Sequence, residues 1–107
     1  MYAIYTPKAM QDMDAVWNET YEASKSDNIA DKRIEEFIDM ISSKKVSPTS
    51  GTALRYKGLF TGYYFINFNK YTAFYRIKED HIEVLRIINS KRDYMDILFG
   101  NNSMNAR

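Results

Sequence analysis

The chain contains no cysteine, which excludes a disulfide framework, a cysteine-ligated zinc site and a thiol nucleophile. It has only four glycines and two prolines, so its composition is neither fibrous nor of low complexity. No apolar run reaches the roughly eighteen residues that a membrane-spanning helix needs, and the segment MYAIYTPKAM has no basic region ahead of an apolar stretch. We therefore expect neither a membrane span nor a secretion signal, and we expect the protein in the cytoplasm.

The motifs that mark common enzyme classes are also missing. No G-x-x-x-x-G-K-[ST], G-x-G-x-x-G or G-x-S-x-G pattern occurs. The single histidine, His81, has no second histidine or cysteine at ligand spacing, so we expect no metal site and no cofactor. Asp12 and Asp14 lie at neighbouring helix positions that do not face each other, as do Glu35 and Glu36. This favours solvated helix faces over paired catalytic carboxylates.

What remains is the composition of an ordinary globular protein, with 45% hydrophobic and 27% charged residues. A chain of this length can fold as one domain, which we place at residues 1–100, with a flexible tail at 101–107. Residues 1–50 carry a net charge of −3 and residues 51–107 a net charge of +4. The basic half is compatible with a nucleic acid or an acidic partner, although such an imbalance also occurs in proteins that bind neither.

Two helices are predicted in the first half. Thr6 is suited to cap a helix whose first residue is Pro7, and this helix extends to about Ser24. Its apolar stripe, spaced by three and four residues, consists of Met10, Met13, Trp17 and Tyr21, with Thr20 on the same face. Asp27 is predicted to cap a second helix that ends near Lys44 and Lys45. The apolar face of that helix comprises Ile29, Ile34, Phe37, Ile38, Met40 and Ile41.

The second half is predicted to form a sheet. After a loop at 46–53, aromatic and β-branched segments predict strands at 63–68, 71–77 and 81–88, preceded by an edge strand at 54–58. The connections are short, which predicts an antiparallel meander. A short strand at 2–5 precedes the helices, and a short helix from Asp93 to Phe99 follows the sheet and ends before Gly100. The fold class is therefore α+β: a two-helix hairpin packed on an antiparallel sheet of three to four strands, with a short C-terminal helix.

The sheet region carries the candidate chemistry. Cleavage of RNA without a metal needs a base for the 2′-hydroxyl, a cation for the phosphate and an acid for the leaving oxygen, and lysine, arginine and tyrosine can fill these roles. The available groups are Arg55, Lys57, Arg76, Arg86, Lys91, Arg92 and Tyr94. Alternatively, the arginine stems pack on the sheet with their charged ends in water. The aromatic residues of one sheet face could stack RNA bases, or could be covered by a partner protein or the C-terminal helix.

The segment LRYKGLFTGYYFINFNKYTAFYRIKEDHIEVLRIINSKRDYMDILFG resembles the RelE/ParE superfamily of bacterial type II toxin–antitoxin modules. The resemblance extends over nearly the whole chain. It includes the FYRI and IEVLRII strands, the RDY that follows, and the helix AMQDMDAVWNETYE with its tryptophan, which is similar to the ParE type. It implies the α+β fold described above, a toxin in the bacterial cytoplasm, and a cognate antitoxin, ParD-like or RelB-like, that silences it.

Two activities are known in this superfamily, because RelE-like toxins cut mRNA on the ribosome whereas ParE-like toxins inhibit DNA gyrase. RelE-like enzymes carry an arginine where this chain has Asn67, Phe68 and Asn69, although Arg92 matches a second cation. Tyr94 comes too early for the usual terminal tyrosine, and the apolar end MDILF is of the ParE kind. The resemblance thus favours a non-enzymatic toxin that acts on the gyrase A subunit.

The alternatives assign the residues differently. In the gyrase interpretation, the predicted target-binding residues are Arg86, Lys91, Arg92, Tyr94 and Phe99. In the nuclease alternative, which acts on ribosome-bound mRNA, the catalytic residues are Lys57, Arg76, Arg92 and Tyr94. A third possibility is a non-toxic module that only binds its antitoxin. In structural terms, Ser90 and Asp93 are spaced as a capping box for the last helix, which leaves Lys91 and Arg92 as exposed cations.

Overall fold

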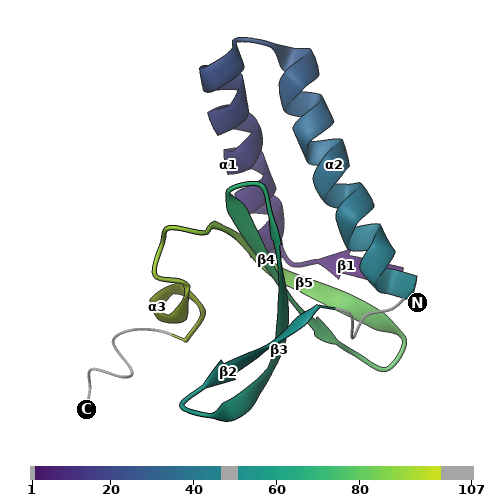
Figure 1. The fold of residues 1–107 in the computed structure, drawn as a ribbon. Coiled ribbons are helices and arrows are strands. Elements are labelled where there is room, and N and C mark those ends of the chain that lie inside the picture. The colour runs from purple at the N-terminus through teal and green to yellow at the C-terminus, as the bar shows by residue number, and fades with distance from the viewer. Residues whose placement is uncertain (1, 47–50, 100–107) are drawn as a thin grey trace.

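A computed structural model describes residues 2–46 and 51–99 of the chain (Figure 1). Along the sequence, the elements are β1 (Tyr2–Tyr5), α1 (Pro7–Ser24), α2 (Asp27–Val46), β2 (Thr52–Tyr56), β3 (Leu59–Phe68), β4 (Tyr71–Ile77), β5 (His81–Asn89) and α3 (Tyr94–Phe99). The predicted tail at 101–107, the stop at Gly100 and positions 47–50 of the predicted loop lie outside the described residues.

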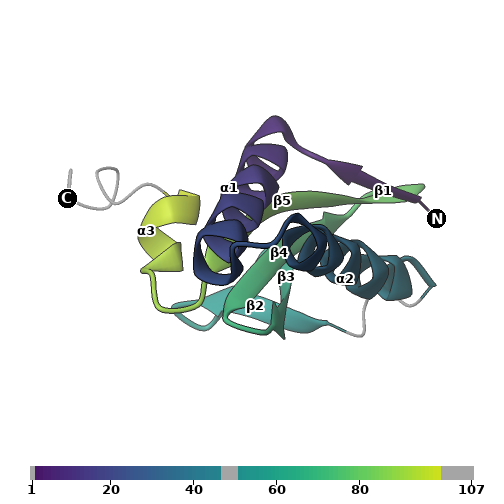
Figure 2. The same cartoon turned by 90° about the horizontal axis from the view of Figure 1, so that it is seen from above.

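The strands form one sheet in the order β1-β5-β4-β3-β2. Strands β2 to β5 are an antiparallel meander, as predicted, and β1 adds a fifth strand by pairing parallel to the first half of β5. The helices α1 and α2 form a hairpin that covers one face of the sheet, and the short helix α3 lies apart from them (Figures 1 and 2). The predicted α+β class is confirmed, with five strands in place of three to four.

Two hydrophobic clusters lie on opposite faces of the sheet. The main core lies under α1 and α2 and includes Phe37, Tyr71, Ile82 and Val84. The second cluster consists of Leu54, Phe74 and Ile88, and the side chains of α3 pack against it. The residues of β4 from Tyr71 to Tyr75 are all buried, because helices cover this strand from both sides. The exposed aromatic face that the sequence suggested is therefore covered, within the chain, by α3.

The start of α1 is as predicted, whereas its buried face is only partly the predicted one. Thr6 Oγ1 accepts a hydrogen bond from the Ala9 N–H (3.1 Å), and Pro7 is the first residue of the helix. The buried side chains of α1 are Ala9, Val16 and Thr20. Of the predicted stripe, Met13 packs partly against the main core, whereas Met10 is 59% exposed. Small residues face the sheet because α1 crosses close to β5. Trp17, another member of the stripe, donates from Nε1 to Asp31 Oδ1 of α2 (2.9 Å).

Three predicted boundaries are wrong. The cap of α2 is Ser26, whose Oγ accepts from the Ile29 N–H (3.2 Å), and Asp27 is the first helical residue. The edge strand runs from Thr52 to Tyr56 instead of 54–58, and β3 begins at Leu59 instead of 63. The reason is the turn between them, where Lys57 and Gly58 have φ values of 53° and 82° and close a two-residue hairpin.

The capping box predicted for the last helix is also wrong. Helix α3 begins at Tyr94, and Asp93 is its cap, because Asp93 Oδ1 accepts from the Asp96 N–H (3.3 Å). Ser90 belongs to the sheet: its N–H donates to the Lys70 carbonyl (2.8 Å), and its hydroxyl contacts that of Thr72 (2.9 Å). Contacts with the start of β4 and with the turn before it therefore fix Ser90 before the helix starts.

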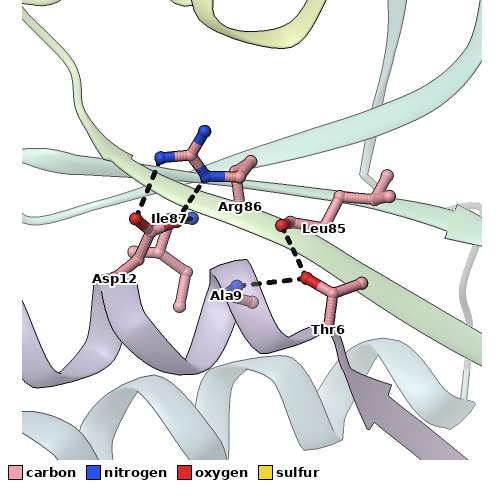
Figure 3. A network of polar contacts seen from close by, with 6 residues as sticks. All are labelled: Thr6, Ala9, Asp12, Leu85, Arg86 and Ile87. Carbon is pink, nitrogen blue, oxygen red and sulfur yellow. Dashed lines mark hydrogen bonds and ion pairs between the residues drawn. The ribbon is translucent and has the colours of Figure 1, made fainter.

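The side chains of Thr6, the cap of α1, and of Asp12, within α1, replace a missing strand beside β5 (Figure 3). The partner strand β1 ends at Tyr5, opposite Val84, and a bulge shifts the register of β5 just beyond that point. Thr6 Oγ1 donates to the Leu85 carbonyl (2.9 Å), and Asp12 Oδ2 accepts from the Ile87 N–H (2.9 Å). The second half of β5 therefore has its edge satisfied by a helix.

The same carboxylate holds a cation. Arg86 donates from Nε to Asp12 Oδ2 (2.8 Å) and from Nη2 to Asp12 Oδ1 (3.0 Å), a two-pronged ion pair (Figure 3). The side chains are 21% and 15% exposed, so water competes weakly for this pair. The sequence expectation of a solvated Asp12 is wrong, and the one for Asp14, which is exposed, is confirmed.

A second carboxylate of α1 contacts the sheet further along. Glu19 accepts a hydrogen bond from the Tyr71 hydroxyl and forms an ion pair with Lys70 Nζ (3.2 Å). The hydrogen bond from Tyr71, aided by Lys70, holds the pKa of Glu19 below its ordinary value. Burial, and next the bond to Glu19, raise the pKa of Tyr71. Helix α1 is thus fixed to the sheet at three places along its length.

We expect Asp12→Ala to lower the free energy of unfolding by about 2–4 kcal/mol, because it leaves Arg86 and the Ile87 N–H without their partner at a poorly solvated site. Urea unfolding measures the change. The control is Asp14→Ala, two residues along the same helix, which we expect to change stability by no more than about 0.5 kcal/mol. Equal effects of the two substitutions would contradict the role of Asp12 in fixing α1 to β5.

Tyr71→Phe removes the donor that lowers the pKa of Glu19. A lowered carboxyl pKa stabilises the fold above the pKa of the unfolded chain, and that stabilisation is lost as the pH falls through the folded value. The difference in the free energy of unfolding between the wild type and Tyr71→Phe should therefore be larger at neutral pH than at about pH 3. Carboxyl NMR titration should show a higher Glu19 pKa in Tyr71→Phe. Tyr21→Phe, on the outer side of α1, is the control, and an unchanged Glu19 titration would refute the contact.

Candidate functional site

The junction between β5 and α3 presents the exposed cations that the sequence singled out. The turn is fixed by its backbone, because the Lys91 N–H donates to Asn89 Oδ1 (2.9 Å) and the Arg92 N–H to the Asn89 carbonyl (3.0 Å). The Lys91 and Arg92 side chains are exposed. Within residues 2–46 and 51–99, no carboxylate forms an ion pair with either of them.

A cleft of about 380 Å³ lies between α1 and this junction. Its lining includes the two cations, the carboxylates of Asp12 and Glu19, and Tyr71. Each carboxylate already has a cation of the fold beside it, Arg86 for Asp12 and Lys70 for Glu19. The cations of the junction are therefore the charges left uncompensated at this cleft, and they can bind an anionic or hydrogen-bond-accepting surface.

The other predicted target-binding residues face inward. Arg86 is engaged by Asp12, whose hydrogen bonds raise its pKa, so a target could reach its guanidinium only in competition with that carboxylate. The Tyr94 ring packs on Phe74, with a centroid distance of 5.2 Å. The Phe99 ring stacks on Tyr56 and Tyr63, at 6.1 and 5.7 Å. These three residues secure the junction and α3, and Lys91 and Arg92 project from it.

The four residues of the nuclease alternative are not brought together. Lys57 lies in the turn between β2 and β3, with Nζ 5.3 Å from the Tyr56 ring. Arg76 pairs with Glu83 (2.7 Å) and lies over the Tyr63 ring. In the register of β4 with β5, Arg76 is opposite Glu83 and Tyr71 is opposite Asn89, so five residues, roughly 16 Å, separate Arg76 from the strand end that leads to Arg92.

Residues 2–46 and 51–99 contain neither a cluster of metal-binding side chains nor a helix that could span a membrane. No three side chains of the types that bind metals gather at one point, and His81 instead has Nδ1 2.7 Å from Asp80 Oδ1 and its ring stacked on Tyr2. No helix in these ranges is both long and apolar enough to cross a membrane.

Sequence reasoning missed the role of Asp12, which orders the strand before the junction. One signal was present. Ala9, Asp12, Val16 and Thr20 are spaced by three and four residues, so they share a helix face, and small residues on that face permit close approach to a strand. The bulkier methionine and tryptophan stripe obscured this face.

Comparison with known proteins places the chain in a family. A sequence model described as the ParE toxin of the type II toxin–antitoxin system parDE matches residues 3–94. No protein with a curated function matches the chain. The fold is similar to that of the chromosomal ParDE toxin–antitoxin system from P. aeruginosa, with 20% identity and a TM-score of 0.70 over 85% of this chain and 97% of that one.

Two other solved structures share the fold. One is the YoeB/ParE toxin from Agrobacterium tumefaciens, with 19% identity and a TM-score of 0.58 over 83% of this chain and 98% of that one. The other is the toxin–antitoxin complex RelBE2 from Mycobacterium tuberculosis, with 18% identity and a TM-score of 0.55 over 82% and 95% of the two chains. At these identities the structures support the fold, and the match over residues 3–94 supports the family. The chain belongs to the ParE toxin family of type II toxin–antitoxin systems.

Proposed function

We propose that the protein is a toxin that acts in the bacterial cytoplasm by binding the A subunit of DNA gyrase, and that a cognate antitoxin neutralises it. The observation that carries this proposal is the distribution of the cations. Lys91 and Arg92 are exposed and uncompensated beside α3, whereas the base, cation and acid that a nuclease needs are far apart or already engaged. The distribution of the cations supports a binding surface better than a catalytic centre.

The residues of the site have different roles, which follow from its geometry. Lys91 and Arg92 contact the target, and the turn fixed by Asn89 limits the entropy that these residues lose on binding. Tyr94 and Phe99 act indirectly, because their rings hold α3 on the aromatic face of the sheet. Arg86 acts through its bond to Asp12. Binding at the junction stabilises the gyrase–DNA cleavage complex, so that DNA breaks accumulate without any bond being cut by the toxin.

The antitoxin is the second partner of this proposal. The structure from M. tuberculosis is described as a toxin–antitoxin complex, and the one from P. aeruginosa as a ParDE system. By membership of the same family, we expect a ParD-like or RelB-like protein encoded beside this chain. Its expression should restore the growth of cells that produce the toxin.

Purified protein mixed with gyrase, ATP and supercoiled plasmid should yield linear DNA after denaturation of the gyrase. The same protein mixed with programmed ribosomes should leave the mRNA intact. Cuts at defined codon positions, together with unaffected supercoiling, would overturn the proposal in favour of the nuclease alternative. Normal growth during induced expression of folded protein would instead support a module that binds an antitoxin without being toxic.

Arg92→Ala should weaken toxicity less than truncation after Arg92 does. The substitution removes one of two cations, whereas the truncation keeps both cations but removes α3 and uncovers Leu54, Phe74 and Ile88. Colony counts after induction measure toxicity, and circular dichroism verifies that each variant is folded. Lys32→Ala, an exposed cation on α2, is the control and should remain fully toxic. Equal loss of activity in both variants, with mRNA cleavage abolished in both, would restore the nuclease interpretation.

A further inference from the structure

The turn between β2 and β3 projects from the sheet as a two-stranded ribbon. Strand β4 pairs with β3 only from Tyr64 onward, so within the described ranges residues 59–63 have β2 as their strand partner and no strand on the other side. At about 3.4 Å per residue, they carry the turn about 17 Å beyond the end of β4. Figure 1 shows this ribbon reaching away from the helical hairpin. We call residues 55–63 the β2–β3 ribbon.

The tip of the β2–β3 ribbon exposes large apolar side chains. Leu59 is 73% exposed, more than any other large hydrophobic residue that the structure describes, and Phe60 is 46% exposed. The tip is also held in one shape, because the Phe99 ring of α3 stacks on Tyr56 and Tyr63 at the base of the ribbon. A rigid element that presents apolar side chains to water loses little entropy when a partner covers them.

The part of the sequence that contains the ribbon has no acidic residue. Residues 40–78 lack aspartate and glutamate, and their cations are Lys44, Lys45, Arg55, Lys57, Lys70, Arg76 and Lys78. Arg55 and Lys57 belong to the ribbon and are exposed, and across the described ranges no carboxylate forms an ion pair with either. Arg55 Nη1 donates instead to the Gly58 carbonyl (3.4 Å), within the turn. The tip therefore combines two apolar side chains with two uncompensated cations.

The shape of the tip restricts the kind of partner. Successive side chains of a strand point to opposite faces, so Leu59 and Phe60 cannot both lie flat on one surface, whereas a groove meets both faces of the ribbon. Their side chains together hold fewer carbon atoms than a myristoyl chain, which alone binds membranes only marginally. The ribbon of a second copy would bring cations against cations, which repel. The partner that fits is a groove with anionic walls.

Double-stranded DNA offers such a groove. Its major groove is about 12 Å wide and admits a two-stranded β-ribbon, whose strands lie about 4.8 Å apart. Lysine and arginine bind the phosphates along the groove, and apolar side chains contact base edges such as the thymine methyl group. We propose that the β2–β3 ribbon is a DNA-binding element, in which Arg55 and Lys57 pair with phosphates while Leu59 and Phe60 enter the major groove. This inference goes beyond the binding of gyrase and is tested without gyrase, so either proposal can fail alone.

Fluorescence anisotropy of a labelled DNA duplex, titrated with the full chain at several salt concentrations, tests the role of the cations. We expect saturable binding to the duplex that weakens as salt rises. Arg55→Ala combined with Lys57→Ala should weaken binding at low salt at least tenfold. It should also reduce the slope of log affinity against log salt by about two, because each phosphate contact contributes about 0.9.

The matched control is Lys8→Ala combined with Lys32→Ala, which removes the same charge at exposed positions of α1 and α2. This variant should retain the slope of the wild type, and circular dichroism verifies that both double variants are folded. Absence of saturable binding to the duplex, or equal changes of slope in the two double variants, would overturn the proposal.

A second variant tests whether the apolar tip enters the groove. Leu59→Ser should weaken binding to the duplex at least fivefold and leave the salt slope unchanged, because it removes an apolar contact and no charge. Ile29→Ser is the control, since Ile29 is a 50% exposed apolar residue of α2, and it should bind as the wild type does. Wild-type affinity of Leu59→Ser would refute the insertion. Binding to phosphatidylglycerol vesicles that Leu59→Ser abolishes, without binding to the duplex, would overturn the proposal in favour of a membrane contact.

Discussion

The contact between α1 and the second half of β5 determines the rest of this structure. Strand β5 lies between β1 and β4 only as far as Val84, and beyond it the strand would present an unpaired edge. Thr6, the cap of α1, and Asp12, within α1, satisfy that edge. Because Asp12 also accepts both hydrogen bonds from Arg86, one carboxylate joins α1 to both the backbone and a side chain of β5 after the bulge. The position of the junction, and hence of its cations, follows from these contacts between α1 and β5.

The short helix α3 depends on the sheet in a different way. Six residues are far too few for a stable isolated helix, so α3 owes its order to packing. Rings from β2, β3 and β4 meet the rings of Tyr94 and Phe99, and Asp93 supplies the cap. The aromatic richness of the sheet is thereby explained on both faces: one face packs on the helical hairpin and the other on α3. In the proposed function this order matters, because cations on a loose segment would lose more entropy on contact with a target.

The sequence was sufficient for the fold class, the order of elements and the turn at Asn69 and Lys70, since these depend on local residue preferences and on the period of apolar residues. It was insufficient wherever a contact joins distant segments. The capping box failed because Ser90 bonds to Thr72 and Lys70, which no local pattern reveals. Asp12 was taken for a solvated residue because its partners lie 74 and 75 positions away. For the candidate site, the exposure of Lys91 and Arg92 was predicted, whereas the engagement of Arg86 was not.

The segregation of charge in the sequence becomes a spatial property once the chain is folded. The net negative charge of residues 1–50 includes the helical hairpin, and the net positive charge of residues 51–107 includes the junction. The molecule therefore has an electric dipole directed from the hairpin toward the sheet, and this dipole exerts a torque on it near any strongly anionic body. Beside DNA, the toxin would turn its basic end inward and its hairpin outward. A toxin aligned in this way would keep its helical hairpin toward solution while its basic end is occupied.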